Sequence, residues 1–91
     1  MFTKAIIIEG VGHEVLIARK LPGVEAERGV SFARCGERTV RFSRDENERM
    51  LQATTQIVCE WVYGVNKRGE VAATNSERHE VRAVLEQLAD F

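Results

Sequence analysis

The sequence predicts an α+β fold: a four-stranded antiparallel sheet made of two consecutive hairpins, followed by two amphipathic helices. Two observations place the strands, because β-branched segments flank glycine-containing turns in residues 4–21 and again in residues 30–43. A third observation places the helices, since residues 43–64 and 76–89 repeat apolar side chains every three or four positions. Strands that all precede the helices favour an antiparallel sheet over alternating β–α units.

The first hairpin is predicted from Lys4–Glu9 and Glu14–Leu21, which flank the glycine-rich turn Gly10–His13. Because successive side chains alternate across a strand, residues of one parity are grouped on one face. One face then carries Ile7, Val15 and Ile17, and the other carries Ile6, Ile8, Leu16 and Ala18. Both faces of this hairpin are therefore expected to need cover.

Two arrangements would supply that cover, and the sequence leaves both open. Either one helix packs on each face of the sheet, or both helices pack on the same face. In the second case the apolar cluster Ile6, Ile8 and Leu16 stays exposed. Such a cluster is unusual for a monomer, so it predicts an interface with a partner or with a second copy.

The second hairpin is predicted from Val30–Cys35 and Arg38–Ser43, which flank the turn Gly36-Glu37. The even-numbered positions are predicted to face the core: Val30, Phe32, Val40 and Phe42. The odd-numbered positions are predicted to face solvent: Ser31, Thr39, Arg41 and Ser43. The preceding Pro22-Gly23 pair breaks regular structure, and Val24–Gly29 is expected to form an exposed loop.

The long helix is predicted between Ser43 and Gly64. Ser43 and Glu46 have the spacing of a capping box, and Gly64 is suited to ending the helix in a left-handed conformation. Trp61 falls on the apolar side and is expected to be buried. A strand over residues 56–63 is the alternative, because several of these residues are β-branched or aromatic. The continuous polar stripe favours the helix.

The rest of the chain is predicted to hold a polar turn at Val65–Gly69 and a final helix from Ser76 to Ala89. Thr74 and Glu77 have the spacing of a second capping box. Residues 70–74 are predicted to be either a short fifth strand or a linker.

The 91 residues are expected to form a single globular domain, residues 1–91, because a chain of this length supports one core. No apolar run approaches the length of a membrane span, and the segment MFTKAIIIEG lacks the cleavage site of a signal peptide. Cys35 and Cys59 are then expected to be reduced thiols, which makes the cytoplasm the expected compartment.

Positive charge is concentrated in residues 1–44, where eight Lys/Arg residues accompany five Glu, whereas residues 45–91 have five Lys/Arg and nine Asp/Glu. Four arginines on or beside the second hairpin predict an anion-binding surface for phosphates or an acidic protein: Arg34, Arg38, Arg41 and Arg44. A charged edge that discourages aggregation of the sheet explains the same residues.

No constellation of residues identifies a reaction. The segment Gly10-Val11-Gly12 lacks the third glycine and the following helix of a phosphate loop. The imidazoles and thiols are His13, Cys35, Cys59 and His79, and none of them form the close pairs typical of zinc sites. We expect no catalytic residue, no metal and no cofactor.

The sequence therefore favours a small non-enzymatic protein that docks on another macromolecule, as an inhibitor, adaptor or regulator of the kind common in bacteria and phages. The apolar cluster and the arginines would carry the docking, to a protein partner or to a second copy. A nucleic-acid-binding module that uses the arginine-rich hairpin is the first alternative. A small enzyme or ligand-binding domain with a pocket between subunits, using His13 or Cys35, is the second.

Overall fold

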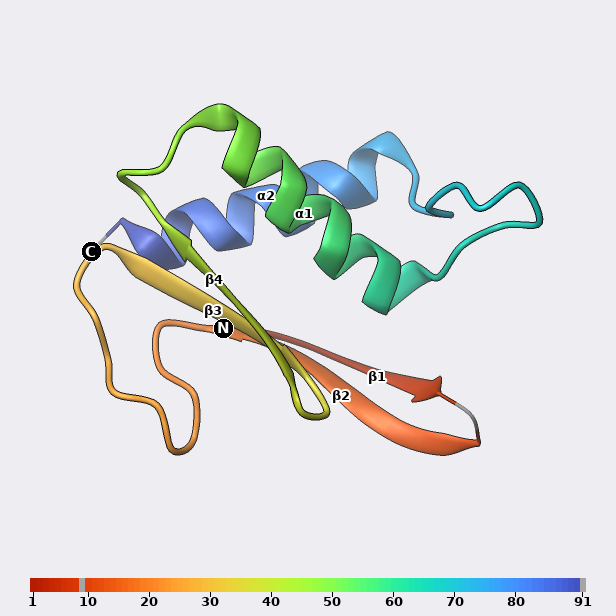
Figure 1. Ribbon diagram of the computed structural model, residues 1–91, viewed down its shortest axis with the longest axis horizontal. Helices are drawn as coiled ribbons and strands as arrows, with labels where there is room; N and C mark the ends of the chain where they lie inside the picture. Colours follow the sequence, from red (N-terminus) through yellow and green to blue (C-terminus); the bar gives the residue numbers. More distant parts are fainter. Residues whose placement is uncertain (9, 91) are drawn as a thin grey trace.

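The computed structural model describes residues 1–8 and 10–90, except for the side chain of Ile8. Four strands precede two helices (Figure 1): β1 (Phe2–Ile8), β2 (Val11–Ala18), β3 (Val30–Cys35), β4 (Arg38–Ser43), α1 (Glu48–Tyr63) and α2 (Asn75–Ala89). Neighbouring strands are antiparallel and lie in the order β1-β2-β3-β4. The α+β prediction is therefore confirmed, and residues 56–63 are helix. In place of a fifth strand, Val65 and Val71 form one isolated bridge.

In both hairpins two residues separate the last paired positions, and this fixes which side chains share a face. β1 and β2 pair Ile8 with Val11, and β3 and β4 pair Cys35 with Arg38. Directly paired residues point to the same face. A turn with an even number of residues therefore groups odd-numbered positions of one strand with even-numbered positions of the next. The predicted grouping by parity across each hairpin was wrong.

In the first hairpin this reversal exchanges the two sets of isoleucines. Ile6 lies on the face that carries Val15, whereas Ile7 lies on the face of Leu16. The side chain of Ile8 is outside the described residues. An exposed cluster of Ile6 and Leu16 does not form, because these two side chains point to opposite faces of the sheet.

In the second hairpin the same reversal separates the four predicted core residues. Val40 and Phe42 point toward the helices, whereas Val30 and Phe32 point to the opposite face. Ser31 was predicted to be exposed to solvent, but it pairs with Phe42 and is fully buried. Its hydroxyl donates a 3.0 Å hydrogen bond to a backbone oxygen of α2, which satisfies the buried polar group.

Both helices pack on one face of the sheet and run in roughly opposite directions across it (Figure 1). The arrangement with one helix on each face is therefore wrong. Buried helix positions that repeat every three or four residues form the main core with the sheet: Leu51, Val58, Val62, Val81, Leu85 and Ala89.

The opposite face is partly covered by residues 19–29, which connect β2 to β3. This cover was not predicted from the sequence. This connection completes a second small core, whose buried members are Ala18, Leu21, Val30 and Phe32. Two arginines of the sheet bond to the connection. Arg34 donates to the backbone oxygen of Pro22 at 3.1 Å, and Arg41 donates to a carboxylate oxygen of Glu27 at 2.8 Å. The cover does not reach Ile7, which remains exposed.

α1 begins later than predicted. Asn47 caps it, and the side-chain oxygen of Asn47 accepts a 3.1 Å hydrogen bond from the backbone N–H of Met50. The Ser43 hydroxyl instead accepts a bond from the N–H of Asp45 at 3.3 Å, so the capping box predicted at Ser43 was wrong. Gly64 ends the helix with a φ of 75°.

α2 begins with the predicted capping box. The N–H of Thr74 donates to Glu77 Oε1 at 2.9 Å, and the N–H of Glu77 donates to Thr74 Oγ1 at 3.1 Å. The hydrogen bond that the Thr74 N–H donates to the Glu77 carboxylate lowers the pKa of this carboxyl, and the side chain of Thr74 lowers it further, because both favour the charged form.

Candidate partner-docking groove

One group of apolar side chains stays exposed where β1 meets the end of α1. Ile7 is 78% exposed and Val65 is 51% exposed. Both line a cavity of about 510 Å³, the β1–α1 groove, whose walls come from β1, the first residue of β4 and the last turn of α1. The other side chains that define its chemistry are Ile6, Arg38, Glu60, Trp61 and Tyr63.

The last turn of α1 supplies two aromatic side chains to this groove. Trp61 and Tyr63 are each half-buried, because they pack partly against the main core and partly line the groove. Trp61 was predicted to be buried, and the structure shows it buried only in part, against the main core. Partial burial raises the pKa of the Tyr63 phenol, and the carboxylates of Glu77 and Glu80 raise it further. The phenol stays protonated at neutral pH and keeps a hydrogen-bond donor.

Gly64 closes this end of the groove by turning the chain away from α1. Its N–H donates to the backbone oxygen of Glu60, and its own oxygen accepts a bond from the N–H of Ala72, each at 2.9 Å. The positive φ of Gly64 suits a residue without a Cβ. The bridge between Val65 and Val71 then holds the following segment beside the groove.

The groove also contains one arginine side chain, that of Arg38. Arg38 begins β4 and pairs with Cys35, so its side chain lies on the helix-facing side of the sheet. Within residues 1–8 and 10–90 it forms no ion pair, although Glu60 lines the same groove. Trp, Tyr and Arg are the residue types that most often dominate binding energy at protein interfaces.

β1 is an edge strand, and it borders this groove. It pairs only with β2, so its outward backbone N–H and C=O groups have no strand partner in the part of the chain that the structure describes. Lys4 is the one charged residue among its seven. A long, largely apolar edge of this kind is a template for pairing with another extended chain.

The structure brings two of the predicted site residues, Ile6 and Arg38, into the groove. It separates the others from them. Leu16 is half-buried against the second core. Arg34 and Arg41 lie on the face opposite the helices, where each is bonded to the connection between β2 and β3.

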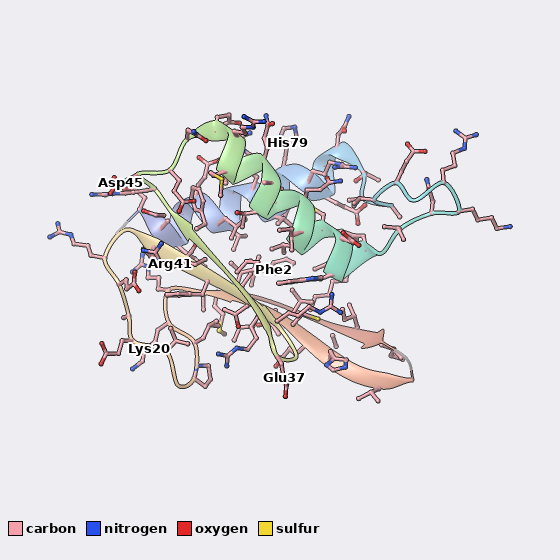
Figure 2. The ribbon with its side chains drawn as sticks, viewed as in Figure 1. Phe2, Lys20, Glu37, Arg41, Asp45 and His79 are labelled. Atoms are coloured by element: carbon pink, nitrogen blue, oxygen red, sulfur yellow. The ribbon has the colours of Figure 1, made fainter. Side chains whose placement is uncertain are left out.

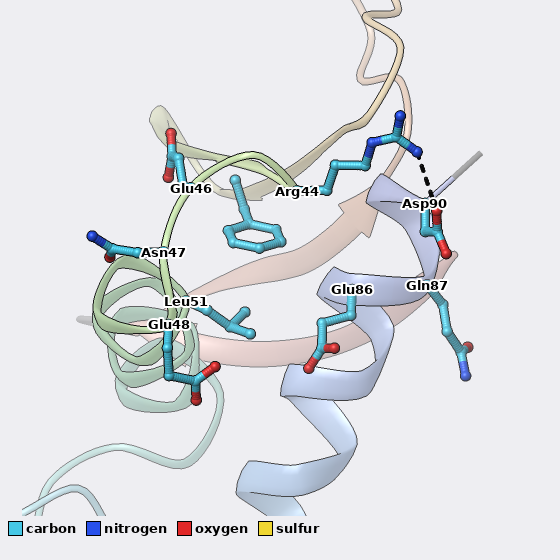
Figure 3. A pocket seen from close by; sticks show the side chains of 9 residues that line it. Arg44, Glu46, Asn47, Glu48, Leu51, Glu86, Gln87 and Asp90 are labelled. Atoms are coloured by element: carbon cyan, nitrogen blue, oxygen red, sulfur yellow. Dashed lines mark hydrogen bonds and ion pairs between the residues drawn. The ribbon is translucent and has the colours of Figure 1, made fainter.

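Arg44 lies just beyond β4, in a cavity of about 450 Å³ near the start of α1 and the end of α2 (Figure 3). Its guanidinium forms an ion pair with Asp90 at 3.2 Å. Carboxylates outnumber Arg44 in this cavity: Glu46, Glu48, Glu86 and Asp90. Such a cavity disfavours an anion, and the structure does not bring the four arginines together in one place.

Sequence reasoning did not identify Ile7 and Tyr63 as contacts, and it placed Trp61 in the core. The even number of residues between the strands was the signal that could have located Ile7. Two aromatic side chains within one turn of the helix-ending Gly64 were the signal for the other two, because a helix end is where a core-facing side chain is most easily left partly uncovered.

The thiols are poorly placed for chemistry. Cys35 and Cys59 are both buried and free, and burial raises the pKa of the Cys59 thiol, which keeps it protonated and weakly nucleophilic. In the described part of the chain, no three His, Cys, Asp or Glu side chains are arranged to hold a metal ion. Neither α1 nor α2 has the length and hydropathy needed to cross a bilayer.

Comparisons with protein-family models, with curated proteins and with solved structures find no match to this chain.

Proposed function

We propose that this protein is a non-enzymatic binding module that captures an extended segment of a partner protein by adding it as a fifth strand beside β1. The observation that carries this proposal is the position of a largely apolar edge strand, with one side open, beside a groove lined by Trp61, Tyr63 and Arg38, which forms no ion pair among the described residues. In this role the protein acts as an inhibitor, adaptor or regulator of its partner. Two buried free thiols suit a reducing compartment, so we place the function in the cytoplasm.

The backbone N–H and C=O groups of β1 that point away from β2 provide the affinity, because each can form a hydrogen bond with the added strand. Side chains of an extended segment alternate between the two faces of the sheet. Those on the helix side enter the β1–α1 groove and contact Ile6, Trp61 and Tyr63. Those on the other side lie against Ile7. The groove therefore gives specificity to an otherwise sequence-independent pairing.

Charge selects the partner's composition. Arg38 and Lys4 are both on the helix-facing side of the sheet near the groove, and Glu60 is the one carboxylate among the described residues that line it. An acidic residue in the bound segment would pair with Arg38 across the groove. A second copy of this chain fits less well, because its β1 strand carries Lys4 and no acidic residue that could pair with Arg38.

The test is a selection of linear peptides from a displayed random library on the wild-type protein. We expect the enriched peptides to alternate apolar and acidic residues. Ile7→Lys should abolish their binding, because it places a charge on the apolar edge. Ile57→Lys is the matched control, since Ile57 is a 39% exposed isoleucine on α1 that does not line the groove, and it should leave binding intact.

Two results would overturn the proposal. One is a set of enriched peptides that bind Ile7→Lys and wild-type protein equally. The other is a stable dimer in light scattering that Ile7→Lys converts to a monomer, because the occupant of the edge would then be a second copy.

A further inference from the structure

A separate cavity of about 330 Å³ lies between α1 and α2. Figure 2 shows His79, one of its lining residues, on the side of the helices that faces away from the sheet. This interhelical cavity is lined by Gln52, Thr55, Gln56, Asn75, Arg78, His79 and Arg82. Each of these side chains has an N–H or O–H group, and none is a carboxylate, although the chain has 14 acidic and 13 basic residues.

Arg78 brings positive charge to this cavity and forms no ion pair with any acidic side chain that the structure describes. Its two terminal nitrogens donate to neutral acceptors, the side-chain oxygen of Gln56 at 2.7 Å and the backbone oxygen of Val71 at 3.3 Å. These bonds hold the guanidinium in place. Arg82 differs, because it forms ion pairs with Glu48 and Glu86, so its charge is already balanced.

The hydroxyl of Thr55 indicates a ligand independently of the charge of Arg78. Its side chain lines the cavity and the residue is only 8% exposed, yet the hydroxyl oxygen has no hydrogen-bond partner among the described residues. Buried polar groups in native proteins are nearly always satisfied. A buried hydroxyl without a partner, on a residue that lines the same cavity as Arg78, is explained when a bound group with oxygen atoms enters and supplies its hydrogen bond.

We propose that the interhelical cavity binds the phosphate group of a small phosphomonoester. Donors reach the cavity from two helices, which suits an oxyanion with three terminal oxygens better than a planar carboxylate that one arginine can satisfy. The volume exceeds that of a phosphate group, which leaves room for the attached carbon atoms. The cavity and the β1–α1 groove share no lining residue, so this proposal stands independently of partner docking.

The test is an NMR titration of the backbone amide signals with glycerol phosphate, inorganic phosphate and acetate at constant ionic strength. We expect glycerol phosphate and inorganic phosphate to give saturable shifts at Thr55, Asn75, Arg78 and His79, with glycerol phosphate binding at least as tightly. Acetate should bind at least tenfold more weakly. A site that binds inorganic phosphate but excludes glycerol phosphate would overturn the phosphomonoester assignment.

Two variants separate binding from folding. Thr55→Val keeps the side-chain shape, so it should weaken phosphate binding about tenfold without lowering the melting temperature. Arg78→Lys keeps the charge but loses the guanidinium fork and should also weaken binding about tenfold. Arg49→Lys is the control, since Arg49 lies on α1 but does not line the cavity. Equal affinity in Thr55→Val and wild-type protein, or shifts that do not saturate, would refute the site.

Discussion

The ammonium nitrogen of Lys4 lies 4.6 Å from the centre of the Tyr63 ring. This contact joins the edge strand β1 to the last turn of α1, which are the two main walls of the β1–α1 groove. Because Tyr63 stays protonated, its ring face attracts the cation through the ring quadrupole. The pair therefore helps to set the distance between the walls of the groove.

Replacing this cation should lower the stability of the fold. Lys4→Met keeps the length of the side chain and removes its charge, and it should reduce the free energy of unfolding by about 0.5–1 kcal/mol. Urea denaturation measures this change. Lys67→Met is the control on the segment after α1 and should have little effect. An equal loss in the two variants would show that the contact with Tyr63 contributes nothing.

The capping box of α2 should be worth more than an ordinary surface contact. Thr74→Ala removes the hydroxyl that accepts the Glu77 N–H and should cost about 1 kcal/mol of stability. Ser76→Ala, two residues further on, is the matched control and should be nearly neutral. Chemical denaturation of both variants tests this, and similar values for the two would contradict the capping role.

The capping box of α2 also makes the free energy of unfolding depend on pH in the acidic range. Because the pKa of Glu77 is lower in the folded chain than in the unfolded chain, Glu77 stabilises the fold above its unfolded pKa. That contribution is lost as the pH falls through the folded pKa. Glu77→Gln should therefore flatten the dependence of unfolding free energy on pH in the acidic range. An unchanged profile would contradict the assignment.

Two adjacent residues of α1 test which side of the helix packs on the sheet. Val58 is fully buried in the main core, whereas Ile57 is 39% exposed. Val58→Ala should cost about 2 kcal/mol through lost burial and a residual cavity. Ile57→Ala should change stability by less than about 0.5 kcal/mol, as is usual at the surface. The opposite order in thermal or chemical unfolding would mean that the helix is rotated.

The thiols should be unreactive in the native state. Cys35 and Cys59 are both buried, and the raised pKa of Cys59 further reduces its thiolate fraction. A colorimetric disulfide reagent should label neither thiol until denaturant is added, after which it should label both. Rapid labelling of the native protein would show that at least one thiol is accessible.

Element order and helix character followed from the sequence because they depend on local signals. Alternation of β-branched residues, the polar stripe of α1 and the spacing of Thr74 and Glu77 each act within a few residues. The start of α1 was misplaced because two cap residues compete. Ser43 and Asn47 both precede the apolar repeat, and only the turn between them shows that Asn47 is the cap.

The faces of the sheet were predictable but were assigned incorrectly. An even turn of two residues, such as Gly36-Glu37, already implies that Val40 faces Ala33 and not Phe32. The cover over the second face was beyond local reasoning. Leu21 is buried because a connection without regular structure folds back on the sheet, and its bonds to Arg34 and Arg41 join residues 12 and 14 positions apart.

The most direct test of docking at β1 is hydrogen exchange of the backbone amides of Phe2–Ile8, with and without a selected peptide. In the free protein, the amides that point away from β2 should exchange quickly, because the edge is unpaired. The peptide should slow the exchange of these amides strongly, in an alternating pattern along β1, and should leave exchange on the outer face of α1 unchanged. Edge amides that still exchange at the free rate when the peptide is saturating would contradict strand addition.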